Sequence, residues 1–129
     1  MTTGNPPFDP EAGARTLAAL QDEQTTAGWT ATLDSQAPGM ADWVIGAVFG
    51  GTYQRSGISL RDRQLLNLGA LTALGGVDPQ LAGHVSTSRR VGMEPSEVTE
   101  ALVHLVPYVG LPKALAALRV AAAVLAEER

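Results

Sequence analysis

The chain has 129 residues and a formal net charge of −4 at pH 7, with 45% hydrophobic and 17% charged residues. The length predicts one domain, and the high apolar content excludes a disordered chain. Cysteine is absent, which excludes disulfide scaffolds, thiol redox chemistry and thiolate metal sites. The acidic balance argues against a nucleic-acid partner, because nucleic-acid-binding proteins carry a basic face. The low charge also favours a subunit interface, since it leaves much apolar surface.

The N-terminal region shows no secretion signal, and no apolar run is long enough to span a bilayer. The longest run of low charge, residues 103–112, is short and contains Pro107 and Pro112. We therefore expect a cytoplasmic protein with no membrane partner. Residues 1–8 carry Thr, Gly, Asn and Pro, which predicts a disordered tail followed by a single domain over residues 9–129.

Helix signals begin directly after this tail. Asp9 is a cap residue and Pro10 a favoured first helical residue, which together open a helix through about residue 22. Residues 24–34 mix threonines with a glycine and allow no firm assignment. Within residues 35–55 an apolar series at helical spacing predicts a second helix: Met40, Trp43, Val44, Ala47 and Val48.

The second half of the chain repeats such signals. Ser59 and Asp62 form a capping box that opens a leucine-rich helix reaching Leu74. Its leucines point in many directions, so we expect this helix to be central and buried on most sides. Asp78 as a cap residue before Pro79 then predicts a helix ending near residues 91–92.

Two further helices complete the predicted set. Glu94, Pro95 and Glu97 open the first of them, which Pro107 should kink or stop. The last is rich in alanine and runs to about Glu127. Because no segment alternates convincingly with a period of two residues, the sequence predicts an all-α fold.

The two histidines are the first candidates for chemistry. His84 shares a predicted helix face with Leu81, Val85 and Ser88. It is therefore either a hydrogen-bonded core histidine or a general acid/base in a water-poor pocket. His104 lies one turn after Glu100, which allows a surface or interface pair as readily as a role in a site.

A metal site has little support, because no third ligand joins the two histidines at a known spacing. Arg55, Arg61 and Arg63 flank a glycine turn, where they either bind a carboxylate in a forked geometry or form a solvated helix end. Tyr53 and Tyr108 stand near predicted helix ends, as ligand donors or as packing residues.

Several short motifs follow one another between residues 49 and 118: residues 49–57, 63–66, 73–75, 81–84, 92, 97–98, 102–105, 108–112 and 116–118. On these motifs the sequence resembles the carboxymuconolactone decarboxylase family, whose fold is shared with the alkylhydroperoxidase D-like proteins. The resemblance implies an all-α, alkylhydroperoxidase D-like bundle of about six to seven helices. It also implies a homo-oligomer, either a trimer or a hexamer.

The resemblance favours one chemical branch of the family. The hydroperoxidase branch has a CxxC pair before the histidine that corresponds to His84, and this sequence has Val77 and Gln80 there, which excludes a peroxidase of that type. The decarboxylase branch has Gly-Glu-x-Trp where this chain has Gly51 in place of the acid and Tyr53 in place of the tryptophan. The remaining positions match that branch: Arg55, Arg63, His84, His104 and Tyr108.

The implied activity is that of a cofactor-free lyase acting on a small unsaturated lactone carboxylic acid by general acid/base catalysis. The resemblance implies catalytic roles for His84, His104 and Tyr108 and substrate-binding roles for Arg55, Arg63, Tyr53 and Gly51, with no metal. Two alternatives stay open. One is a cyclase, isomerase or decarboxylase with changed chemistry, favoured by the pocket that Gly51 would enlarge. The other is a non-catalytic oligomer that binds a small ligand.

Overall fold

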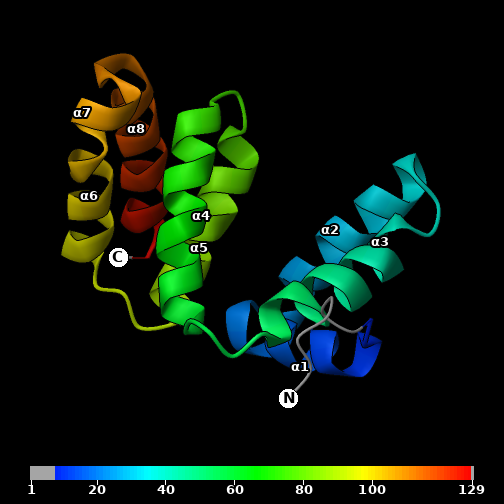
Figure 1. Ribbon diagram of the computed structural model, residues 1–129. Coiled ribbons are helices and arrows are strands. Elements are labelled where there is room, and N and C mark those ends of the chain that lie inside the picture. The colour runs from blue at the N-terminus through cyan, green and yellow to red at the C-terminus, as the bar shows by residue number, and fades with distance from the viewer. Residues whose placement is uncertain (1–7, 129) are drawn as a thin grey trace. The chain divides into compact units, whose positions relative to one another are not determined.

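The computed structural model describes residues 8–128, and all the regular secondary structure in that range is helical, which confirms the all-α fold. The chain divides between Ile58 and Ser59 into two compact units, which are described in turn (Figure 1). The expectation of a disordered tail covers residues 1–8, of which residues 1–7 lie outside the described residues and Phe8 is described. The expectation of a single domain over residues 9–129 stays a prediction.

The N-terminal unit contains helices α1 (Pro10–Leu20), α2 (Glu23–Gln36) and α3 (Met40–Trp43), then a π-helical segment (Val44–Phe49) and a 3₁₀ turn (Thr52–Gln54). Asp9 caps α1 as expected, because its side chain accepts a hydrogen bond from the Ala12 amide at 3.0 Å. The first helix ends two residues earlier than predicted, because Asp22 caps a new helix through the Thr25 amide at 2.7 Å. That new helix occupies the stretch that the sequence left unassigned.

Close backbone approach holds this unit together. A Cβ atom at Gly13 would overlap the Ile45 carbonyl, and one at Gly46 would overlap the Phe8 ring, so only glycine allows α1 and Phe8 to lie against the π-helical segment. By contrast, α2 has no buried residue. The first half of α2 is held by Gln21, whose side-chain oxygen accepts hydrogen bonds from the Thr26 hydroxyl and the Trp29 indole N–H.

The C-terminal unit contains α4 (Leu60–Leu74), α5 (Asp78–Arg90), α6 (Pro95–His104), the single-turn α7 (Val106–Val109) and α8 (Leu111–Glu127). Figure 1 shows its four long helices running alongside one another. The Ser59 cap of α4 is confirmed by a 3.0 Å hydrogen bond from the Asp62 amide to the Ser59 hydroxyl. Asp78, expected as the cap of α5, is instead its first helical residue after Val77, and its carboxylate lies in the first turn, where the helix dipole favours negative charge.

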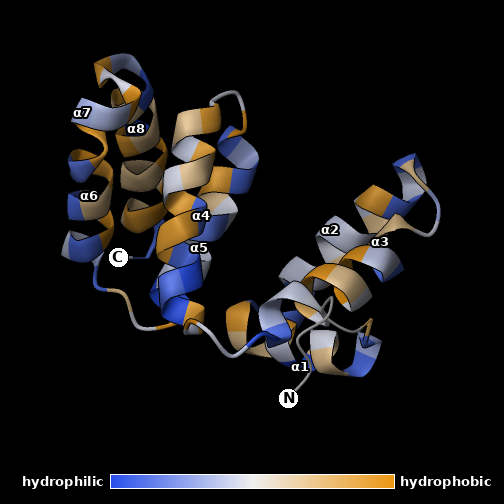
Figure 2. Cartoon of the chain, in the orientation of Figure 1, coloured by the Kyte–Doolittle hydropathy of each residue, from blue (hydrophilic) through white to orange (hydrophobic). Residues whose placement is uncertain are grey.

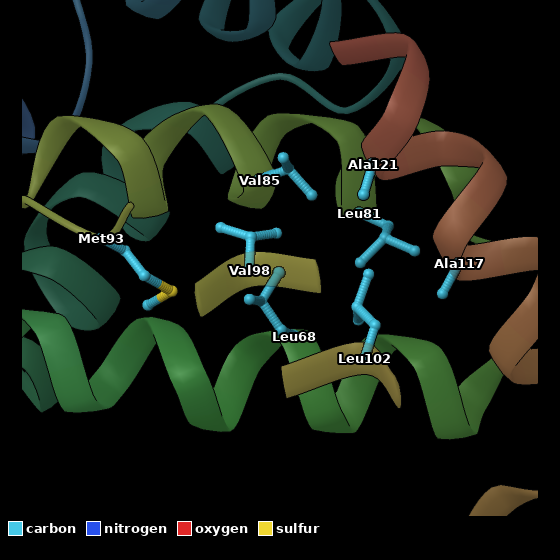
Figure 3. Close-up of a cluster of buried hydrophobic side chains, with 8 residues drawn as sticks. All are labelled: Leu68, Leu81, Val85, Met93, Val98, Leu102, Ala117 and Ala121. Carbon is cyan, nitrogen blue, oxygen red and sulfur yellow. The ribbon is translucent and has the colours of Figure 1, made fainter. Parts of the chain in front are cut away.

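A cluster of buried apolar side chains fills the space between these four helices (Figure 3). Leu68 contributes from α4, Leu81 and Val85 from α5, Val98 and Leu102 from α6. Met93 from the loop and Ala117 and Ala121 from α8 complete the cluster. The side chains point toward one another from all sides, so this cluster is the core of the unit.

The expectation that α4 is buried on most sides is wrong. Leu66 and Leu74 are 63% and 67% exposed, whereas Gln64, Leu68 and Thr72 are buried. The buried residues are spaced four apart and so form a single stripe, against which α5, α6 and α8 pack. The opposite face of α4 therefore remains uncovered within this unit.

Candidate functional site

The seven predicted site residues fall on both units. Gly51, Tyr53 and Arg55 belong to the N-terminal unit, which ends at Ile58. The other four belong to the C-terminal unit: Arg63 on α4, His84 on α5, His104 at the end of α6 and Tyr108 on α7. Each group is described within its own unit.

His84 lies where α5 packs against α4. Its Nδ1 atom is 2.8 Å from the Oε1 atom of Gln64 and 3.5 Å from the Nδ2 atom of Asn67. The backbone carbonyl of His84 accepts a 2.7 Å hydrogen bond from the Ser88 hydroxyl. The ring is half-buried and is held on one nitrogen by side chains from the neighbouring helix. This is the arrangement of an oriented histidine rather than of a solvated one.

Burial lowers the pKa of His84 below its ordinary value of 6.5, because the imidazolium ion loses hydration when it is removed from water. At neutral pH the side chain is therefore a neutral imidazole. A neutral imidazole can accept a proton at one nitrogen while the other donates a hydrogen bond, which is the state that a general base requires.

Gln64 and Asn67 are functional candidates that the sequence did not single out. Gln64 is fully buried, and its Nε2 atom has no hydrogen-bond partner among the described residues. Asn67 is half-buried and approaches the Gln64 oxygen at 3.4 Å. The available signal was a glutamine four residues before Leu68 and eight before Thr72, which puts a polar side chain on the face that becomes buried.

His104 has different surroundings. It is exposed, and its ring lies 5.3 Å from that of Tyr108, measured between centroids, with Tyr108 itself 74% exposed. The structure thus pairs His104 with Tyr108 at the junction of α6 and α7. The ring of His84, by contrast, has its polar contacts with Gln64 and Asn67 on α4, so the two histidines have different neighbours.

The arginines at the start of α4 divide into two roles. Arg61 forms an ion pair with Glu97, and this bridge ties the start of α4 to the start of α6. Arg63 is half-buried and stands four residues before Asn67, so the two residues share one face of α4. Arg61 is thus engaged by Glu97, while Arg63 shares a helix face with an amide that contacts His84.

In the N-terminal unit, Tyr53 is half-buried and its ring lies 4.9 Å from that of Phe49, between centroids. Phe49 in turn lies 6.4 Å from Trp29, so the tyrosine ends a row of three aromatic rings. Gly51 is buried directly before the 3₁₀ turn, while Arg55 is exposed directly after it. The side chain that best explains this turn is Gln54, which donates to the Phe49 carbonyl at 2.7 Å and to the Thr16 hydroxyl at 2.8 Å.

A cavity of about 470 Å³ lies at the other end of the α4–α5 pair. Thr72, Leu81, Lys113 and Ala117 are among its lining residues, and none of the seven predicted site residues lines it. Lys113 donates to the Ala73 carbonyl at 2.7 Å, which places its ammonium group at the C-terminal end of α4.

Among residues 8–128, no three His, Asp or Glu side chains gather closely enough to ligate a metal ion. No helix within this range combines the length and apolar character needed to cross a bilayer.

Comparison with known proteins gives two findings. The family model described as the carboxymuconolactone decarboxylase family matches residues 38–123, which is about two thirds of the chain. An uncharacterized 15.0 kDa protein from the nqo9–nqo10 intergenic region of Paracoccus denitrificans is 36% identical over 81 residues. That alignment covers 62% of this chain and 60% of the relative's length. The chain therefore belongs to the carboxymuconolactone decarboxylase family.

Proposed function

We propose that this protein is a cofactor-free lyase that removes carbon dioxide from a small unsaturated carboxylic acid, with His84 as its proton carrier. The observation that carries the proposal is the half-buried His84 ring, held at 2.8 Å by Gln64 and neutral at physiological pH because burial lowers its pKa. Membership of the carboxymuconolactone decarboxylase family supports the reaction class.

The reaction needs one proton to be delivered to carbon. At neutral pH the substrate carboxyl group is ionised, so carbon dioxide leaves as the carbon–carbon bond breaks, and the electron pair of that bond passes into the conjugated system of the substrate. His84 takes up a proton from water at its second nitrogen and gives it to the carbon. Atoms and charge balance without a cofactor, and a positioned acid/base of this kind contributes about 10²- to 10⁴-fold in rate.

Substrate binding in this proposal rests on Arg63. It is supported by the half-buried position of Arg63 on α4, four residues before Asn67, because a guanidinium group can bind a second carboxylate of the substrate through two hydrogen bonds. Arg55, Tyr53 and Gly51 remain proposed substrate-binding residues, and His104 and Tyr108 remain proposed donors, because the resemblance implies these roles.

A second candidate is a cyclase, isomerase or decarboxylase acting on a bulkier acid. It is favoured by the buried Gly51 directly before the 3₁₀ turn, at a position where the resemblance implies that the decarboxylase branch has a glutamate. A third candidate, a non-catalytic oligomer that binds a small ligand, would need neither an oriented histidine nor a pKa lowered by burial.

We also propose that the protein assembles with copies of itself, as a trimer or hexamer. The support is an apolar stripe on the outer face of α4, which consists of the exposed residues Leu66, Ala70, Ala73 and Leu74. Residues at this spacing share one helix face, and Figure 2 shows largely apolar or neutral colouring over α4 beyond its hydrophilic first turns. An uncovered stripe of this kind is typical of a surface that is buried on assembly.

The proposed reaction is tested by measuring carbon dioxide release from carboxymuconolactone with the purified protein, its His84→Ala variant and its His104→Ala variant. We expect release by the wild type, a loss of at least about 10²-fold in His84→Ala, and a smaller loss in His104→Ala. Circular dichroism of each variant provides the control for folding. Equal release by the wild type and a folded His84→Ala variant would overturn the role of His84, and no release by the wild type would favour the second candidate.

A further inference from the structure

The hydrogen bond between Gln64 and His84 determines where the imidazole carries its proton. The Oε1 atom of Gln64 is an acceptor only, and it lies 2.8 Å from Nδ1 of His84. A contact of this length needs a donor, so Nδ1 must bear the hydrogen. A neutral imidazole has one N–H, and the Nε2 atom of His84 therefore carries the lone pair.

Asn67 lies beside this pair. Its Nδ2 atom, a donor, is 3.4 Å from the Gln64 Oε1 atom and 3.5 Å from the His84 Nδ1 atom, so both of its contacts are long and weak. The 2.8 Å separation between Gln64 Oε1 and His84 Nδ1 is therefore the strongest contact among the three side chains, and in it Gln64 accepts and Nδ1 donates.

The polar side chains that contact His84 are neutral amides. A carboxylate in the same place would stabilise the charged form of the ring, but an amide does not. From α4, Gln64 and Asn67 face the His84 ring, with Arg63 one turn before Asn67. The core residues of α6 and α8 that pack with α5 are apolar: Val98, Leu102, Ala117 and Ala121. Burial is the one cause of its lowered pKa, and no charged neighbour contributes to the shift.

We propose that Gln64 is a positioning residue that fixes His84 as the Nδ1–H tautomer and thereby presents Nε2 as the basic atom of the site. The catalytic role of Nε2 rests on the proposed function. The tautomer of His84 does not depend on any reaction. A glutamine orients the ring without adding a negative charge. A carboxylate at the same position would orient the ring equally well but would favour the imidazolium ion.

The test is ¹⁵N NMR of the histidine side chains in the full-length protein as a function of pH. In the wild type we expect Nδ1 of His84 to show a protonated-nitrogen signal and Nε2 an unprotonated one at neutral pH. Gln64→Met removes the acceptor at similar length, so His84 should become a mixture of both tautomers. Gln64→Glu keeps the acceptor and adds charge, so the titration midpoint of His84 should rise by about one pH unit or more.

Gln80→Met provides the matched control, because it makes the same change at an exposed position of α5 and should leave both signals of His84 unchanged. A proton on Nε2 in the wild type would overturn the inference, and so would an unchanged tautomer in a folded Gln64→Met variant. If that variant fails to fold, the wild-type spectrum and the Gln64→Glu titration decide the question. Failure of the proposed function is separable, because it would appear as turnover that is independent of His84 while the predicted tautomer is still observed.

Discussion

The two faces of α4 carry opposite kinds of surface on the same fifteen-residue helix. The inner face holds Gln64, Leu68 and Thr72, each at most 3% exposed, and packs on α5, α6 and α8. The outer face holds Leu66 and Leu74, which are 63% and 67% exposed. A polar residue is thus buried while leucines are exposed, which reverses the usual order of burial.

This reversal indicates two separate tasks for one helix. Buried polar atoms are usually hydrogen-bonded, and the oxygen of Gln64 lies 2.8 Å from Nδ1 of His84, although its Nε2 atom has no partner among the described residues. Exposed leucines in a row are stable only where another surface covers them, and the proposed partner is a second copy of the chain. The inner face therefore forms the core and holds His84, and the outer face is the surface proposed for assembly.

The largest predicted effect is the loss of assembly when charged residues replace leucines on the outer face of α4. We expect the double variant Leu66→Glu/Leu74→Glu to convert the oligomer into monomers, because burying an unpaired charge at an interface costs about 3–5 kcal/mol. Light scattering coupled to size-exclusion chromatography measures the mass directly. Glu97→Gln, which changes a charge away from this face, is the control and should leave the mass unchanged.

Two outcomes would contradict this assignment of the outer face. A wild type that is monomeric at micromolar concentration would refute the proposed assembly. A double variant that retains the oligomer but unfolds more easily at every protein concentration would show that another part of the same chain covers the stripe.

Leucine-to-alanine substitutions on the two faces of α4 should lower the free energy of unfolding by different amounts. Leu68→Ala removes a core side chain that is 1% exposed, so it should lower the free energy of unfolding by about 2–5 kcal/mol. Because this cost arises within the folded unit, it should not depend on protein concentration. Leu66→Ala should cost less, and its cost should fall as the protein is diluted. Urea denaturation followed by circular dichroism, at two protein concentrations, distinguishes these patterns.

The sequence predicted most of the fold because its helix ends are marked by local signals. Ser59 and Glu94 cap α4 and α6 as the pattern required, and the glycine pair after Leu74 ends α4 at Gly75, whose φ angle is +71°. The α2 helix was missed because its threonines and Gly28 are poor helix formers. Its support comes from Gln21, a tertiary contact that no local pattern shows.

The site was only partly predictable, for a related reason. His84 could be singled out because a histidine on an apolar helix face is unusual. Gln64 could not, because its role depends on which face of α4 is buried, and the many leucines of that helix pointed to burial on most sides. His104 could be singled out by residue type alone, yet the structure places it in an exposed contact with Tyr108. Three-dimensional packing, rather than residue type, separates the two histidines.

The smallest predicted effect is the contribution of His84 to the pH dependence of the free energy of unfolding. Burial lowers its pKa in the folded protein below the ordinary value of 6.5, so the unfolded chain takes up a proton more readily. Above pH 6.5 both states are neutral at this residue and stability does not depend on it. As the pH falls below 6.5, protonation favours the unfolded state, and stability should decrease by at most about 1.4 kcal/mol per pH unit from this one group. Urea denaturation between pH 5 and 8 should show this decrease in the wild type and a flatter profile in His84→Gln, whereas parallel profiles would show that His84 is not the responsible group.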